Sequence, residues 1–293
     1  MKIFTERIGF GRRQFLIAAM MAVVFCGLKP AVADDTEVAS GAPFKGTLYL
    51  IGGGADQSLQ RFVDIAGGAK AVIAILPHSS GVPQEAADEA ANLFTARGVK
   101  NVVTIMPNQK VGLPKNVNAV FFTGGDQNRL MRLLDPVLAT EIHDFLKRGG
   151  LVGGTSAGAA AAPVRMIAGG MEDKLLKSDS LLLGDGLGYL PGFVVDTHVL
   201  QRCRHDRLMV ALSMIENVTG IGLDEDTAIE ITGNKITVRG QGHARFYKRS
   251  DKHSSTLATV GKGDKASVRN MLYSVLSEGD EWEFEPASVK ASN

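Results

Sequence analysis

Residues 151–160 read Leu151-Val152-Gly153-Gly154-Thr155-Ser156-Ala157-Gly158-Ala159-Ala160, and this stretch decides the fold. An apolar run leads into the pattern G-x-S-x-G at 154–158, and an alanine-rich segment follows it. In a nucleophile elbow this pattern joins a strand to a helix, and its glycines permit a strained turn that exposes the serine Oγ. The stretch therefore predicts strand, turn and helix, with Ser156 as the nucleophile. The alternative is a loop of small residues that only packs a helix on a sheet.

Short apolar segments alternate with segments of helical spacing before this stretch. The predicted strands before it are 46–51, 71–76, 101–106 and 119–123, and the predicted helices are 59–66, 84–97 and 137–148. This alternation indicates βαβ units, and therefore an α/β fold with a parallel sheet and helices on both faces. Right-handed crossovers bring the loops after the strands to one edge, where ligands bind in such folds.

The second half of the chain is richer in predicted strands. We expect strands at 192–196, 228–232 and 235–239, an exposed loop at 249–268 and a final helix–strand piece at 269–284. The composition agrees with a globular α/β domain, because 45% of the 293 residues are hydrophobic and only 6% are aromatic.

The N-terminal 33 residues have the layout of an export signal. A basic stretch ends in Arg12-Arg13, an apolar run follows from Phe15 to Leu28, and 31–33 offers an A-x-A cleavage site. The paired arginines match the twin-arginine export pattern. The apolar run is shorter than the ~20 residues that span a bilayer, so we expect cleavage rather than an anchor. The expected organisation is a signal at 1–33, a linker at 34–45 and one hydrolytic α/β domain at 46–293, located in the periplasm or outside the cell.

Charge and cysteine content exclude several classes of partner. Removing residues 1–33 takes away five of the 32 Lys and Arg residues and one of the 31 Asp and Glu residues, which leaves 27 basic and 30 acidic side chains. No basic block remains, so we expect no nucleic-acid partner and no membrane contact after cleavage. Cys203 is the only cysteine of the mature chain, so no internal disulfide can form.

Two glycine-rich turns follow predicted strands. Gly52-Gly53-Gly54 does not complete the dinucleotide fingerprint G-x-G-x-x-G, because its last position is Gln57. We therefore expect a turn where the backbone passes close to a ligand or a neighbour. The Gly124-Gly125 turn is a candidate oxyanion donor through its backbone, together with the Ala157 N–H at the start of the helix after Ser156.

A serine nucleophile needs a base and an acid that orients it. His198 ends the predicted strand at 192–196 and is the first candidate base, and His78, which also follows a strand, is the second. The candidate acids are Glu172 and Asp173, which come after the nucleophile helix, and Asp196, two residues before His198. The residues alone do not choose among these acids.

Three arginines follow the candidate base. Arg202, Arg204 and Arg207 lie within ten residues of His198, and planar guanidinium groups suit a substrate carboxylate. The alternative is a solvated helix start with local ion pairs.

Four segments together resemble the cyanophycinases, a serine peptidase family that also contains aspartyl dipeptidases. They are Gly124–Gln127, Gly154–Ala159, Asp196–Arg204 and Gly222–Ala228, in the family's order and approximate spacing. Leu276–Asp280 also looks like its closing strand. The resemblance implies a flavodoxin-like three-layer sandwich with a mostly parallel sheet, related to class I glutamine amidotransferases and usually dimeric.

The resemblance also implies site residues and a substrate. It selects a triad of Ser156, His198 and an acid just after the nucleophile helix, taken as Glu172 with Asp173 still open. The implied substrate pocket consists of Gln127, Asp196, Arg202, Arg204 and Arg207. The arginines would hold the carboxylate of a β-linked aspartate, and Asp196 would help seat its α-amino group.

The expected function is hydrolysis of β-aspartyl bonds in cyanophycin, a poly-aspartate backbone that carries arginines, with release of β-Asp-Arg dipeptides through an acyl-enzyme on Ser156. No metal or organic cofactor is expected. Family members often have Gln where this chain has Thr197, so the polymer and a short isoaspartyl peptide both remain open as substrates. An esterase of the α/β-hydrolase type and an exported protein that binds aspartyl peptides without cleaving them also remain open.

Overall fold

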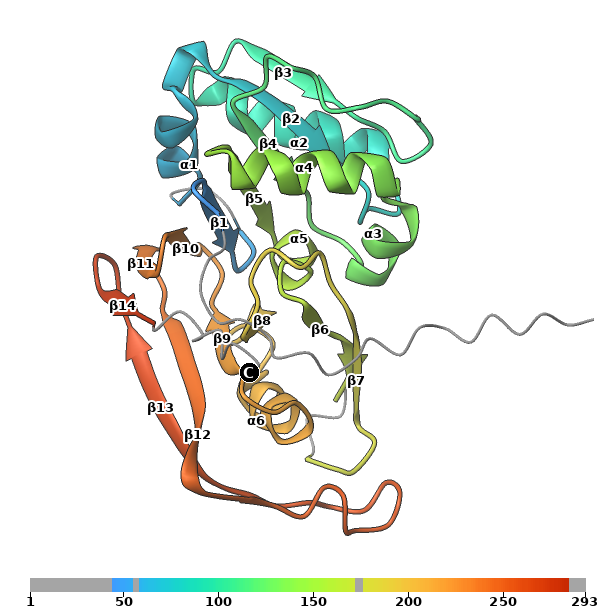
Figure 1. The fold of residues 1–293 in the computed structure, drawn as a ribbon, viewed down its shortest axis with the longest axis vertical. Helices are drawn as coiled ribbons and strands as arrows, with labels where there is room; N and C mark the ends of the chain where they lie inside the picture. Colours follow the sequence, from blue (N-terminus) through green and yellow to red (C-terminus); the bar gives the residue numbers. More distant parts are fainter. Residues whose placement is uncertain (1–43, 55–57, 172–175, 285–293) are drawn as a thin grey trace, which may run out of the picture. The chain divides into compact units, whose positions relative to one another are not determined.

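The computed structural model describes residues 44–54, 58–171 and 176–284. These residues belong to one compact unit, Glu37–Asn293, and the preceding unit, Met1–Thr36, lies outside the described residues with the predicted export signal. Figure 1 shows the arrangement of helices and strands. None of the described helices is long and apolar enough to cross a membrane.

An eight-stranded sheet forms the centre of the domain, in the order β14-β11-β10-β1-β5-β4-β2-β3. Five strands are parallel: β1 (Thr47–Ile51), β2 (Val72–Leu76), β3 (Asn101–Thr104), β4 (Ala119–Phe122) and β5 (Leu151–Thr155). Three more extend the sheet antiparallel beside β1: β10 (Thr227–Thr232), β11 (Lys235–Gly240) and β14 (Glu281–Glu283). The mostly parallel sheet predicted from the sequence is confirmed.

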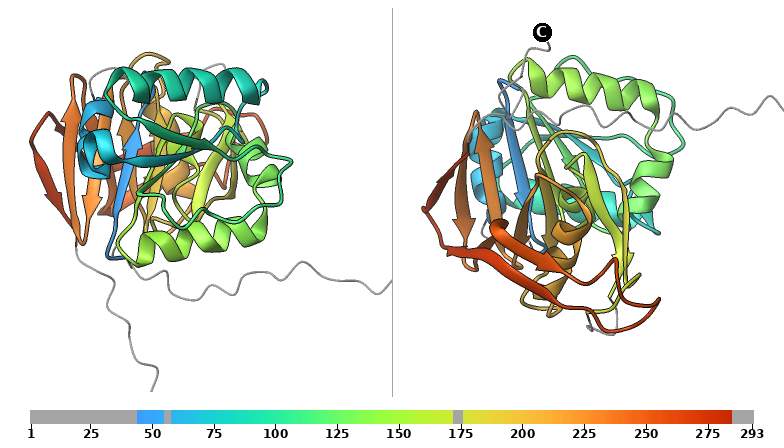
Figure 2. Two further views of the ribbon diagram at one scale, coloured as in Figure 1. Left: turned by 90° about the horizontal axis from the view of Figure 1, so that it is seen from above. Right: turned by 60° about the horizontal axis from the view of Figure 1, so that its bottom comes forward.

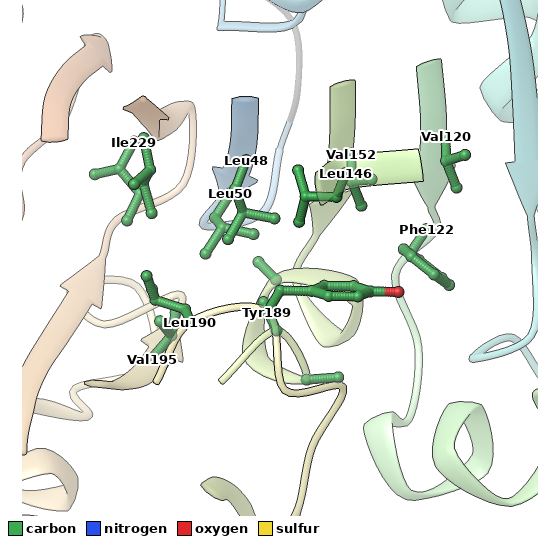
Figure 3. Close-up of a cluster of buried hydrophobic side chains, with 14 of the residues drawn as sticks. Leu48, Leu50, Val120, Phe122, Leu146, Val152, Tyr189, Leu190, Val195 and Ile229 are labelled. Carbon is green, nitrogen blue, oxygen red and sulfur yellow. The ribbon is translucent and has the colours of Figure 1, made fainter. Parts of the chain in front are cut away.

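Alternating side chains of the strands build a core on each face of this sheet. In β1, Leu48 and Leu50 belong to one buried cluster and Tyr49 and Ile51 to the other, as the period of two in a strand requires. One face is covered by α1 (Ser58–Ala66) and α2 (Pro83–Ala96), and the other by α4 (Pro136–Lys147). Figure 2 shows α2 and α4 on opposite sides of the sheet, and Figure 3 shows part of the cluster under α4. This is the predicted three-layer arrangement.

A second sheet of four strands has the order β13-β12-β9-β8. Its strands are β8 (Phe193–Thr197), β9 (Thr219–Leu223), β12 (Ala244–Ser255) and β13 (Val268–Leu276), and α6 (His205–Met214) packs on it. A two-stranded sheet contains β6 (Arg165–Gly170) and β7 (Leu181–Asp185), and the remaining helices are α3 (Gln127–Leu133), α5 (Ala157–Ala160) and the 3-10 turn η1 (Gly68–Lys70). Strands β8 and β9 are parallel neighbours, with Thr197 opposite Leu223.

Three details differ from the sequence prediction. Residues 249–255 belong to β12, so the predicted loop at 249–268 is wrong over its first part. The predicted helix within 269–284 is also wrong, because β13 and β14 occupy that segment. Phe44 is buried and the Lys45 N–H donates to Lys147 O at 3.3 Å, so these two residues belong to the domain rather than to the linker.

Candidate active site

Ser156 occupies a strained turn between β5 and α5. Its backbone has φ 50° and ψ −111°, a conformation that residues other than glycine rarely adopt. Its N–H donates to Ile51 O at 2.9 Å. A Cβ at Gly154 would lie 2.7 Å from the carbonyl carbon of Gly158, and one at Gly158 would lie 2.6 Å from Phe122 O. The two glycines of G-x-S-x-G are therefore required by close backbone packing around the turn.

His198 directly follows β8 and also has a positive φ, 55°. Its Nε2 lies 2.6 Å from Ser156 Oγ, within hydrogen-bond distance. Its own N–H donates to Gly52 O at 2.9 Å, and a Cβ at Gly53 would lie 2.1 Å from the imidazole Cε1. The neighbour that the Gly52-Gly53-Gly54 turn approaches is thus the imidazole ring.

The acid that contacts the imidazole is Glu225. Its Oε1 lies 2.6 Å from His198 Nδ1, and its backbone N–H donates to Gln201 Oε1 at 3.0 Å. The sequence prediction placed Glu172 here, with Asp173 as the alternative, and both lie outside the described residues. Among the described residues, Glu225 is the carboxylate on the Nδ1 side of the ring, so we take it as the acid of the Ser-His-acid arrangement, while the role of Glu172 stays a prediction.

Glu225 is close to His198 because of strand register rather than sequence distance. Thr197 and Leu223 face each other at the ends of the parallel strands β8 and β9, so the next residues of both strands leave the same edge of the sheet. The sequence contained a usable signal, since Glu225 follows the apolar run 219–223 as His198 follows 193–197. Glu225 lies within the family-like segment Gly222–Ala228, but the sequence pattern predicted no catalytic role for it.

Asp224, the residue before Glu225, stabilises this edge of the sheet through its side-chain contacts. It is fully buried and pairs with Arg245, and it also accepts the N–H groups of Leu200 at 3.1 Å and His243 at 3.2 Å. The buried carboxylate therefore ties the backbone after His198 to the backbone before Glu225.

Burial lowers the pKa of His198 below its ordinary value of 6.5, and the hydrogen bond to Glu225 opposes this effect by raising it. Arg202 lowers it further through its charge. The ring is therefore neutral at pH 7 and able to accept a proton.

The Gly124-Gly125 turn lies beside the nucleophile. A Cβ at Gly124 would lie 3.4 Å from Ser156 Cβ, and Gly125 has φ 142° with its Cβ position 2.3 Å from Ser79 O. Asp126 then caps α3 by accepting the N–H of Asn128 at 2.8 Å. Ala157 is the first residue of α5, where a backbone N–H has no partner within the helix. Both candidate oxyanion donors are thus close to the serine: Ala157 is the next residue in the chain, and Gly125 follows Gly124, which lies against the Ser156 side chain.

Two of the predicted pocket arginines face a buried carboxylate. Asp196 is 2% exposed, and its oxygens lie 3.4 Å from Arg207 Nε and 3.6 Å from Arg204 Nη1. Burial raises the pKa of Asp196, while Arg207 and Arg204 lower it. Arg204 Nη1 also donates to Thr197 O at 2.9 Å. Asp196 therefore neutralises arginine charge rather than orienting the imidazole.

The other two predicted pocket residues differ in setting. Arg202 is exposed beside His198, and its charge acts on the imidazole. Gln127 is the first residue of α3, and its Nε2 donates to Ile167 O at 2.7 Å. In this structure the Gln127 amide therefore holds β6.

Among the described residues, His198 is the histidine that contacts Ser156 Oγ, and His78, the second candidate base, makes no hydrogen bond with it. His78 is 1% exposed, and burial lowers its pKa to about 4. A neutral buried histidine of this kind is part of the core.

A cavity of about 450 Å³ opens beside the Ser156–His198 pair. Its lining includes Gly53, Gly124 and one face of α2. Substrate groups next to the attacked carbonyl can enter it. No group of three metal-ligating side chains occurs in the described part of the chain.

The sequence profile of peptidase family S51 matches residues 48–239. The chain belongs to this family. It is 33% identical to a cyanophycinase of Geminocystis herdmanii over 81% of this chain and 93% of the relative. It is 32% identical to one of Synechococcus elongatus over 80% of this chain and 78% of the relative. The fold is similar to the crystal structure of a peptidase from an acI-B1 Actinobacterium, with TM-score 0.59 and 18% identity over 83% of this chain and 98% of that one. The chain is therefore a serine-type S51 peptidase.

Proposed function

We propose that this protein hydrolyses cyanophycin to β-Asp-Arg dipeptides through an acyl-enzyme on Ser156. The observation that carries the proposal is the hydrogen-bonded chain from Ser156 Oγ to His198 to Glu225. The substrate is taken from the cyanophycinases to which the chain is similar. Because the product keeps its own β-Asp–Arg linkage, the broken bond is the backbone bond that joins successive aspartyl units, and not the β-aspartyl bond that the sequence led us to expect.

In the first step, Ser156 Oγ attacks the carbonyl carbon while its proton passes to His198 Nε2. Glu225 holds the Nδ1 proton and stabilises the imidazolium that forms. The N–H groups of Ala157 and Gly125 donate to the oxyanion. The tetrahedral intermediate collapses as His198 gives its proton to the leaving amine.

In the second step, water attacks the acyl-enzyme. His198 Nε2 takes one proton from the water and returns it to Ser156 Oγ, which releases the carboxylate product. No metal or organic cofactor enters either step.

Substrate selection at the carboxylate side rests on the arginines that follow His198. Arg204 and Arg207 share one buried carboxylate, Asp196, and Arg202 adds a third guanidinium, so net positive charge remains next to the imidazole. A free carboxylate of the substrate would pair with that charge, and Arg202 is the exposed member of the three arginines. Asp196, from its buried position, would accept the α-amino group. Gln127 would have to break its hydrogen bond to Ile167 O before its amide could bind the substrate.

We also propose that the N-terminal segment is an export signal and that the protein forms a homodimer. The twin-arginine pattern at 12–16 and the A-x-A site at 31–33 support export and cleavage, with action in the periplasm or outside the cell. N-terminal sequencing of the protein from the outer compartment tests this. A homodimer is proposed by family resemblance, and light scattering tests it.

The deciding experiment compares the unmodified protein with Ser156→Ala on purified cyanophycin and on short isoaspartyl peptides. We expect dipeptide release by the unmodified protein and none by the variant. A serine-directed phosphonate should label Ser156 in the folded protein. Equal turnover by both proteins would refute the mechanism, and rapid cleavage of the short peptides with an intact polymer would change the substrate to an isoaspartyl peptide.

A further inference from the structure

The cavity beside Ser156 is lined on one side by carboxylates that have no role in the proposed reaction. Apart from His198, its charged lining residues among those described are Glu85 and Glu89, both on α2. No lysine or arginine of the described chain lines it. Because burial keeps His198 neutral at pH 7, the charge of this cavity is negative.

Glu85 and Glu89 are one helical turn apart on the same face of α2. Both are exposed, and neither carboxylate has a hydrogen bond or an ion pair with another described residue. The neighbouring Gln84–Asp88 pair, by contrast, is joined by a hydrogen bond of 2.9 Å. Like charges at this spacing destabilise a helix slightly. A cation between the two carboxylates would remove that repulsion.

Several of the other lining residues are apolar. Leu59, Ala90, Phe94 and Phe121 are buried, and Leu93 is half-buried beside them. A long side chain with a methylene stem can cover such a surface while its charged end reaches the carboxylates. The cavity therefore suits a long cationic side chain better than a metal ion or a small amine.

We propose that Glu85 and Glu89 bind the guanidinium group of an arginine side chain next to the bond that Ser156 attacks. A planar guanidinium with several N–H donors can serve two carboxylates at once, which an ammonium does less well. This subsite rests on the proposed function and adds to it the recognition of the cationic half of the substrate. The arginines beyond His198 and these glutamates would together select a unit with both charges.

Binding to the Ser156→Ala protein separates this subsite from catalysis. The ligands are a peptide of two backbone-linked β-Asp-Arg units and the same peptide with citrulline, which is neutral and of equal size, in place of arginine. We expect the arginine peptide to bind about tenfold more tightly in calorimetry, the effect of one charge-assisted contact. The double variant Glu85→Gln/Glu89→Gln should lose this preference.

The matched control is Asp88→Asn, which removes a carboxylate from the same helix outside the cavity and should keep the preference. Equal binding of the two peptides by the parent, no binding of either, or an unchanged preference in the double variant would each overturn the subsite. Failure of the proposed hydrolysis has a different signature: with Ser156 present, the arginine preference persists but neither peptide is cleaved. Cleavage of both peptides at equal rates leaves the hydrolysis standing and removes the subsite.

Discussion

Replacing Glu225 with glutamine removes the charge that faces the imidazole while keeping the size of the side chain. The carboxylate lies 2.6 Å from His198 Nδ1, and its side chain is 38% exposed whereas that of His198 is 9% exposed. When Ser156 gives up its proton, the ring becomes positive, and the carboxylate stabilises it. An amide at the same place carries no charge and can turn an N–H toward Nδ1, which favours the wrong tautomer.

The size of the effect follows from the distance. Two unit charges about 4 Å apart interact by roughly 4 kcal/mol at the effective dielectric constant of a site near the surface. That energy corresponds to about 10³-fold in rate, and the exposure of Glu225 reduces it somewhat through solvent screening. Loss of the favoured tautomer makes the fall in rate larger again. We therefore expect kcat to fall about 10³-fold, with little change in KM.

The assay is single-turnover cleavage of a peptide of two backbone-linked β-Asp-Arg units, together with the rate at which a serine-directed phosphonate labels Ser156. Far-ultraviolet circular dichroism and thermal unfolding check that the variant is folded. Glu172→Gln is the control, because Glu172 was the acid predicted from the sequence. Near-normal activity of Glu225→Gln, with a loss of about 10³-fold in Glu172→Gln, would refute the assignment.

Three further predictions concern the groups around this pair. Because burial lowers the pKa of His198 and catalysis needs the neutral ring, kcat/KM should fall only below pH 6.5 on the acid side, and a fall beginning above pH 7 would contradict this. Arg245→Met should lower the free energy of unfolding in urea by about 3–5 kcal/mol, since it leaves Asp224 as an uncompensated buried charge; the double variant with Asp224→Asn should recover part of the loss. Gly125→Ala should lower kcat by about 10²-fold or more, because the new Cβ would lie 2.3 Å from Ser79 O and force the oxyanion turn away, while unchanged kinetics would remove Gly125 from the mechanism.

The nucleophile and base could be predicted because local sequence carries their constraints. The glycines around Ser156 are needed by backbone contacts, and those contacts leave a pattern in the sequence. His198 follows an apolar strand, and the strand-end rule for parallel sheets placed it at the ligand edge. Both inferences used information within a few residues of the group concerned.

The acid could not be chosen in the same way, because Glu225 comes from a strand paired with β8 in a different sheet from the one that carries Ser156. The pairing of β8 with β9 brings it to His198, and a single sequence does not report strand order. The β12–β13 hairpin escaped prediction for another reason. Most β13 side chains are exposed or half-buried, so the strand lacks the alternation of apolar and polar residues that marks a strand with one buried face.

The geometry of the Ser156–His198 pair depends on β1, which carries neither residue. Both residues have positive φ, a strain that costs about 1–3 kcal/mol at each position. The Ser156 N–H donates to Ile51 O and the His198 N–H to Gly52 O, so the end of β1 holds the two strained residues from different sheets. Gly53 then lets the imidazole lie against the backbone. The glycine-rich end of β1 is therefore the joint that sets the distance between nucleophile and base, although none of its side chains takes part in the chemistry.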